Sequence, residues 1–323
     1  MKRFPAIFLI IFFLPLLAVR GQSLEESGEL VPALSPEAPG PGENLTIRVS
    51  SPDVSLAGFL ILWRENGVLK KEGVGETLYE TKTGPAGSVL NISVSARRAN
   101  EFLSKEISVR PAEASLVWEA DVYTPMFYQG KGLASHQSEV RFVALVDMFD
   151  NSGKKASPQN IFYEWSVGNK VDKGRSGLGK DTFRLRGEIV SRSKDVLLLA
   201  SLPNTNIKAR AGVLLDFVEP ELLVYKENPL SGLRESEVAR SVPIEEGEAT
   251  FVAEPYFFSR DIFNSGRLAF DWRVGGRKIE NLKTSNKITI GGENKGSSAV
   301  SVSVLNPVSF LQKAFASFSV VLR

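Results

Sequence analysis

His136 is the only histidine among 323 residues, so it is the first place to look for acid–base chemistry. It lies in the polar run G-L-A-S-H-Q-S-E, where Ser135 and Ser138 flank it and Glu139 follows. A hydrolytic serine is held on a strained turn such as G-x-S-x-G beside its base, and this run has no such turn. We therefore interpret His136 as a solvated loop residue and predict that the chain is not an enzyme.

The stretch D-M-F-D-N-S-G-K, at residues 147–154, gathers oxygen atoms that could bind a cation. Ca²⁺ takes six to eight oxygen ligands, and Asp147, Asp150 and Asn151 would supply some of them. The spacing differs from the alternating D-x-[DN]-x-[DN]-G loop, and a similar stretch from Arg260 brings two arginines to the same place. We predict a turn here, with Ca²⁺ as the weaker alternative, and no cofactor or metal for the chain.

The composition excludes further kinds of site. The chain has 39 basic and 37 acidic residues, a net charge of +2, whereas a nucleic-acid-binding protein carries a clear basic excess. It has no cysteine, which removes disulfides, thiol nucleophiles and thiolate metal sites. We predict no nucleic-acid partner.

An internal repeat of about 100 residues is the strongest pattern in the sequence. Trp63, Trp165 and Trp272 each end an apolar run and stand 102 and 107 residues apart. Two residues separate each tryptophan from a pair rich in Gly and Asn, which closes a two-residue hairpin because such residues adopt positive φ at little cost. Alternating strands flank each copy, and a tryptophan on a central strand is typical of the core of immunoglobulin (Ig)-like sandwiches. The repeat thus predicts an all-β chain of three tandem Ig-like β-sandwich domains, with the three tryptophans in their cores.

The boundaries follow from the repeat. We assign domain 1 to residues 32–111, domain 2 to 112–218 and domain 3 to 219–323, joined through the short connections V-R-P-A-E and V-E-P-E. A proline in each connection predicts a stiff link. Residues 22–31, rich in Glu, Ser and Gly, are expected to be a flexible leader.

Residues 1–21 have the layout of a secretory signal peptide. Lys2 and Arg3 precede an apolar run of 16 residues, and Val19 and Gly21 suit a cut before Gln22. The alternative is an uncleaved anchor, but a spanning helix needs about 20 apolar residues. The segment predicts export to the periplasm, cell surface or medium, with the membrane contacted only through this segment.

The most unusual segment is D-V-Y-T-P-M-F-Y-Q-G-K-G, which begins at Asp121. Tyr123, Met126, Phe127 and Tyr128 stand beside a proline and two glycines, a combination typical of a binding patch. The alternative is that these side chains seal the junction of domains 1 and 2 or one end of a sandwich. The run E-P-Y-F-F at residues 254–258 is a weaker analogue with the same two interpretations.

Several stretches resemble a known group of proteins. They are W-R-E-N-G from Trp63, T-K-T-G-P-A-G-S from Thr81, L-V-W-E-A-D-V-Y-T-P-M-F-Y-Q-G-K from Leu116, and E-N-P-L and A-E-P-Y-F-F later in the chain. With them, most of the chain resembles uncharacterised exported PKD-like and Ig-like multidomain proteins of genome-reduced candidate-phylum bacteria, often encoded near type IV pilus genes. The resemblance implies a surface or periplasmic role linked to pili.

Together these observations predict a non-enzymatic scaffold or adhesion protein of the cell envelope, associated with a type IV pilus system and binding protein partners. The alternative is a carbohydrate- or polymer-binding module that uses exposed aromatic residues of domain 2. An exposed coplanar pair among Trp118, Tyr123, Phe127 and Tyr128 would favour the alternative, and burial of all four would favour the scaffold.

Overall fold

The fold is described by a computed structural model, which covers residues 28–187, 191–230, 232–245, 247–292 and 295–323. The predicted signal peptide and most of the predicted leader lie outside these residues. The chain forms two compact units. Of the described residues, one unit consists of 28–33, 46–79 and 91–108, and the other consists of those within 34–45, 80–90 and 109–323.

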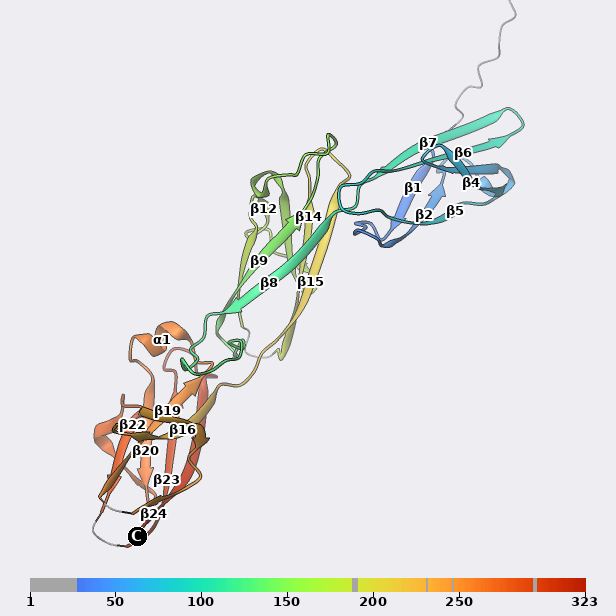
Figure 1. Cartoon of the computed structure of the whole chain (residues 1–323). Helices are drawn as coiled ribbons and strands as arrows, with labels where there is room; N and C mark the ends of the chain where they lie inside the picture. Colours follow the sequence, from blue (N-terminus) through green and yellow to red (C-terminus); the bar gives the residue numbers. More distant parts are fainter. Residues whose placement is uncertain (1–27, 188–190, 231, 246, 293–294) are drawn as a thin grey trace, which may run out of the picture. The chain divides into compact units, whose positions relative to one another are not determined.

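In the described part of the chain, the strands pair into six sheets, two for each copy of the repeat; Figure 1 shows how the strands are arranged. The first copy has the sheets β1-β2-β5 and β4-β3-β6-β7. Their strands are β1 (Val31–Ser35), β2 (Asn44–Ser50), β3 (Leu60–Glu65), β4 (Val68–Val74), β5 (Leu78–Lys82), β6 (Leu90–Arg98) and β7 (Glu101–Val109).

The second copy has the sheets β13-β9-β8 and β11-β10-β14-β15, with β12 also paired to β10. Its strands are β8 (Glu113–Ala120), β9 (Glu139–Asp147), β10 (Phe162–Val167), β11 (Lys170–Val171), β12 (Gly177–Leu178), β13 (Thr182–Arg186), β14 (Ser193–Ser201) and β15 (Lys208–Asp216).

The third copy has the sheets β17-β16-β19-β22 and β18-β24-β23-β20-β21. Its strands are β16 (Glu221–Asn228), β17 (Gly232–Val238), β18 (Ser241–Ile244), β19 (Glu248–Tyr256), β20 (Ala269–Val274), β21 (Arg277–Lys278), β22 (Lys287–Gly291), β23 (Gly296–Leu305) and β24 (Lys313–Leu322). The described residues add one short helix, α1 (Arg260–Asn264), and three single turns of 3-10 helix, Leu56–Gly58, Pro158–Asn160 and Glu280–Leu282. The chain is therefore three tandem Ig-like β-sandwiches, as the repeat predicts.

Alternation of apolar side chains along the strands forms the cores. In β9, Val140, Phe142 and Ala144 point inward and are buried, while the residues between them are more exposed. A period of two puts such residues on one face of a strand. The predicted hairpins also form, since β3–β4, β10–β11 and β20–β21 are each joined by two residues.

The three repeat tryptophans have no exposed surface. Each indole Nε1 donates a hydrogen bond to a backbone carbonyl 13 to 15 residues downstream: Trp63 to Glu76 at 2.8 Å, Trp165 to Lys180 at 2.9 Å and Trp272 to Ser285 at 2.9 Å. A buried indole needs such an acceptor, so the loop that supplies it is part of each core.

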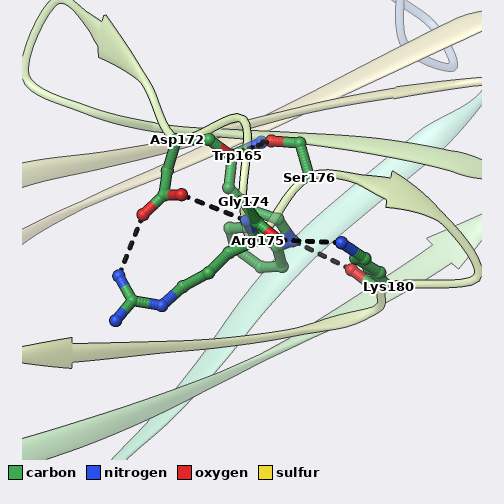
Figure 2. Close-up of polar contacts among 6 residues, drawn as sticks. All are labelled: Trp165, Asp172, Gly174, Arg175, Ser176 and Lys180. Atoms are coloured by element: carbon green, nitrogen blue, oxygen red, sulfur yellow. Dashed lines mark hydrogen bonds and ion pairs between the residues drawn. The ribbon is translucent and has the colours of Figure 1, made fainter.

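Figure 2 shows how the second sandwich holds this loop beside Trp165. The Ser176 hydroxyl accepts a hydrogen bond from the Trp165 backbone N–H at 2.9 Å and donates one to the Asp172 carbonyl at 2.7 Å. The Lys180 ammonium donates to the Gly174 carbonyl at 2.8 Å, and Arg175 pairs with the Asp172 carboxylate at 2.9 Å. These bonds fix the carbonyl that the indole needs.

The first sandwich begins earlier than the sequence predicts. We placed residues up to 31 in a flexible leader, but Leu30 is fully buried and β1 begins at Val31. The Glu29 side chain pairs with Lys105 at 3.1 Å, and its backbone N–H donates to Asp53 at 3.2 Å. The polar run E-E-S-G-E directly before Leu30 gives no sign that the sandwich starts there.

Candidate functional site

The aromatic segment, residues 123–128 between β8 and β9, packs against the end of β19 in the third sandwich. The run at residues 254–258, its weaker analogue in the sequence, supplies much of the receiving surface. Tyr225, Tyr256 and Phe257 belong to the same buried cluster as the core of the second sandwich. The two unusual aromatic runs are therefore two sides of one junction.

Tyr123 is the residue that joins the two sandwiches most directly. Its phenol donates a hydrogen bond to the Glu254 carboxylate at 2.8 Å, and its ring stacks on Phe263 with centroids 3.5 Å apart. Its backbone N–H donates to the Phe258 carbonyl at 2.7 Å, and its carbonyl accepts the Phe257 N–H at 2.9 Å. Side chain and backbone thus both cross the junction.

Burial controls the ionisation of this pair. Desolvation raises the pKa of Tyr123 well above its usual range, and the neighbouring Glu254 carboxylate adds to the effect. Desolvation also raises the pKa of Glu254, although the bond from Tyr123 and the charge of Lys287 oppose it. Glu254 is only 7% exposed, so its bond from Tyr123 offsets part of the cost of burying the carboxylate.

Phe127 and Tyr128 add edge-to-face ring contacts. Phe127 meets Tyr225 with centroids 5.4 Å apart and planes at 79°, and Tyr128 meets Tyr256 at 5.6 Å and 81°. The hydroxyls of Tyr225 and Tyr256 lie 2.8 Å apart in a buried hydrogen bond. Burial raises the pKa of Tyr256 well above its ordinary value, and its bond to Tyr225 adds to this rise. Such pairs favour T-shaped geometry because ring edges are positive and ring faces negative.

Met126 is the exception within the segment, because its side chain is fully exposed. The other three residues proposed to bind a partner, Tyr123, Phe127 and Tyr128, are half-buried in the contacts with the third sandwich. The binding role of the four residues stays a prediction, and Met126 is the member whose surface is open.

One alternative given by the sequence is corrected. We expected a sealing role either at the junction of domains 1 and 2, which the segment soon follows in the chain, or at one end of a sandwich; the first of these is wrong. The strand β8 intervenes, and eight residues at about 3.3 Å each carry the chain roughly 25 Å to the other end of the sandwich. The contacts of the segment therefore lie with the third sandwich.

A second part of the junction is polar and was not foreseen. Gln312 is fully buried, and its amide group donates hydrogen bonds to the Ser135 hydroxyl at 3.2 Å and to the His136 carbonyl at 3.1 Å. Its amide oxygen accepts bonds from the Ser259 N–H at 3.0 Å and from the Asn306 side chain at 2.7 Å. One glutamine thus joins three loops.

The residues around His136 act in this junction. Ser135 is fully buried and accepts the bond from Gln312, while the Ser138 hydroxyl donates to the Ser135 carbonyl at 2.7 Å. The centroids of the His136 and Phe217 rings lie 5.9 Å apart. The serine hydroxyls that a nucleophile hypothesis would need are therefore held in structural bonds.

The oxygen-rich stretch forms a turn. The Asp150 carboxylate accepts hydrogen bonds from the Ser152 N–H at 2.9 Å, the Ser152 hydroxyl at 2.6 Å and the Lys154 N–H at 3.0 Å. These bonds lower the pKa of Asp150. Asp147 pairs with Lys155 at 2.8 Å, and the Asn151 carbonyl accepts a bond from Arg110 at 3.2 Å. Within the described ranges, no cluster of three or more His, Cys, Asp or Glu residues has the geometry to hold a metal ion.

Comparison with known proteins gives structural likeness only. No family model and no curated protein matches the sequence. The three N-terminal domains of the Highly Immunogenic Outer Capsid protein (Hoc) of bacteriophage RB49 are 10% identical with a TM-score of 0.26, over 92% of this chain and 98% of that chain. The fibronectin(III)-like modules of Clostridium thermocellum CbhA are 8% identical with a TM-score of 0.27, over 58% and 95%. The N-terminal four Ig domains of Dscam1 isoform 8.4 are 12% identical with a TM-score of 0.23, over 88% and 71%.

Likeness at this level does not tell what the chain binds, and the fold is read from its own sheets. In the part of the chain that the structure describes, no helix has the length and apolar character needed to cross a bilayer.

Proposed function

We propose that the chain is an exported, non-enzymatic scaffold protein of the cell envelope that binds protein partners and is associated with a type IV pilus system. The observation that carries the scaffold role is the junction of the second and third sandwiches. The resemblance of the sequence to exported multidomain proteins supports the envelope and pilus parts of the proposal.

A scaffold must hold its modules at a fixed angle, whereas neighbouring domains in a chain usually move relative to one another. This junction opposes such motion with three kinds of contact: aromatic rings, a partly buried Tyr123–Glu254 hydrogen bond and the hydrogen bonds of the Gln312 amide. Separating the sandwiches would remove the Tyr123 donor from Glu254 and both acceptors from the Gln312 amide nitrogen, and it would expose the rings to water. These costs favour one fixed arrangement of the two sandwiches.

A polysaccharide-binding module is less well supported. Stacking on sugars requires exposed ring faces, and Trp118, Tyr123, Phe127 and Tyr128 are all half-buried. The face of Trp118 is covered by the Lys131 ammonium, 3.1 Å from the ring centre, while Tyr123 stacks on Phe263. The rings of this group are engaged in contacts within the chain.

The scaffold role is tested by the double substitution Phe127→Ser with Tyr128→Ser, with Met126→Ser as the matched control in the same loop. The double variant should lower the melting temperature of the second and third sandwiches and broaden their distance distribution in small-angle scattering. Met126→Ser should change neither, because its side chain makes no buried contact. If the double variant behaved like the control, the locked junction would be refuted.

Export and partners need separate tests. Mass spectrometry of the native protein should find a mature N-terminus near Gln22. Cross-linking in the native envelope should recover proteins of the pilus assembly. An intact N-terminus would mean that the segment stays as an anchor, and recovery from the cytoplasm alone would contradict export.

A further inference from the structure

Part of the edge of β24 has no neighbouring strand. On one side β24 pairs with β23 along its whole length, and on the other β18 pairs with it only from Ser319 to Leu322. Among the residues described, no strand pairs with positions 313–318 on that second side. The Ser319 N–H donates toward β18, to Arg240, so strand alternation directs the N–H groups of Phe315 and Ser317 to the same open side.

This edge has little of the usual protection against strand addition. Natural edges carry charges, prolines or bulges that discourage pairing with another chain. The edge strand β13 carries Arg184 and Arg186, and β21 consists of Arg277 and Lys278. By contrast, the open stretch of β24 carries one charge, Lys313 at its start, and the residues A-F-A-S-F at 314–318 have neither a charge nor a proline.

A hollow of about 680 Å³ includes the start of the open stretch, residues 313–315, in its lining. Its walls are the connection to the third sandwich, the start of β16 and the adjoining ends of β23 and β24. Two apolar side chains in it are unusually open, Phe315 at 65% and Leu305 at 42% exposed. The charged lining consists of Glu219, Glu221 and Lys313, an excess of one negative charge.

We propose that this edge of β24 binds an extended segment of a partner protein as an added strand, in line with β18. Main-chain bonds to Phe315 and Ser317 would supply affinity, as in other cases of strand addition. Apolar side chains of the segment would contact Leu305 and Phe315, and a basic side chain would lie near Glu219 and Glu221. This inference rests on the proposed scaffold role and names the kind of partner that the third sandwich takes.

The test uses the purified chain and a displayed library of random peptides of about seven residues, a typical strand length. Selection should enrich peptides that alternate apolar residues and carry lysine or arginine. Adding an enriched peptide should slow hydrogen exchange at the Phe315 and Ser317 amides. A copy of the peptide with N-methylated backbone should bind at least about tenfold more weakly, because it cannot donate ladder bonds.

Three variants locate the site. Ser317→Pro removes a donor from the open edge, and Phe315→Lys adds a charge to it, so each should weaken binding roughly tenfold or more. Ser317→Ala keeps the backbone N–H and should bind normally. Phe315 is mostly exposed, so Phe315→Lys should keep the melting temperature even if Ser317→Pro disturbs the strand.

Three outcomes would overturn the inference: no enriched peptide, binding that survives both edge variants, or self-association of the chain that the same variants abolish. The last would identify a second copy as the occupant. The junction of the second and third sandwiches is measured separately by scattering, so loss of the peptide site would leave the scaffold role standing.

Discussion

At the scale of single residues, the polar atoms inside the sandwiches determine which substitutions matter. Each core tryptophan fills space and also donates one hydrogen bond to a loop carbonyl, so its ring and its N–H contribute separately. Among the described residues that are buried, Glu254 is the acidic one, and desolvation raises its pKa. Both features lead to measurable expectations.

Trp165→Phe should keep an aromatic ring in the core but leave the Lys180 carbonyl without its donor. We expect a loss of about 1–3 kcal/mol in the free energy of unfolding, measured in urea. Trp165→Ala should cost more, about 3–5 kcal/mol, because it also leaves a cavity. Phe162→Leu, on the same strand but 39% exposed, is the control and should stay within about 0.5 kcal/mol of the parent. Equal stability of Trp165→Phe and the parent would show that the indole bond is unimportant.

Glu254→Gln should change how stability depends on pH. The pKa of Glu254 is raised in the folded chain, so the folded state keeps a proton that the unfolded state has already lost. The stability that the protonated Glu254 contributes is therefore fully present below the ordinary glutamate pKa and is lost as pH rises through the folded pKa. Glutamine keeps an oxygen to accept the Tyr123 bond and does not ionise.

The melting temperatures of the parent and of Glu254→Gln should therefore diverge as pH rises from the ordinary glutamate pKa through the folded pKa of Glu254. The variant should become more stable relative to the parent at the higher pH. Parallel curves would mean that the carboxylate is not desolvated in the folded chain.

At the scale of elements, turns and loops rather than strands carry the specific chemistry. The turn at residues 147–155 shows this, since Asp150 closes it with three hydrogen bonds and Asp147 pairs with Lys155. The aromatic segment shows it again, because a loop of the second sandwich contacts a sheet of the third. The length of the preceding strand determines at which end of a sandwich such a loop lies.

Asp150→Ala should lower the melting temperature at neutral pH, because the Ser152 and Lys154 N–H groups lose their acceptor. The folded pKa of Asp150 is lowered, so its contribution is present above the ordinary aspartate pKa and disappears as pH falls through the folded value. The two proteins should therefore converge in acid. Added Ca²⁺ should leave the parent unchanged, and a rise in its melting temperature that Asp150→Ala abolishes would instead support the cation site.

At the scale of the molecule, the second and third sandwiches belong to one compact unit and share a buried cluster. Tyr225, Tyr256 and Phe257 are residues of the third copy that pack in the core cluster of the second. We therefore expect that destabilising one of these two sandwiches also destabilises the other, because the junction links them.

Trp272→Ala, in the third sandwich, should destabilise that sandwich by about 3–5 kcal/mol and also reduce protection in the second. Hydrogen exchange followed by mass spectrometry would report peptides of each sandwich separately. Unchanged protection throughout the second sandwich would show that the two unfold independently. Trp63→Ala, in the other compact unit, is the comparison and should leave both unaffected.

Local patterns in the sequence determined the strands, the core residues and the hairpins of this protein. Alternation of apolar residues, the three tryptophans and the Gly and Asn pairs specify strands, cores and hairpins, because each acts over a few residues. They predicted three all-β domains and the strands that flank each tryptophan. The signal peptide belongs to the same kind of pattern and stays a prediction.

Only the tertiary structure decided how the unusual segments are used. Tyr123 and its acceptor Glu254 are 131 residues apart, and Gln312 lies 177 residues from Ser135. Composition marked both aromatic runs as notable, but it did not show that they face each other. That outcome depends on the length of β8 and on the hydrogen bonds that form once the chain has folded. Because the partners of each bond are far apart in the sequence, no short stretch shows that they will pair.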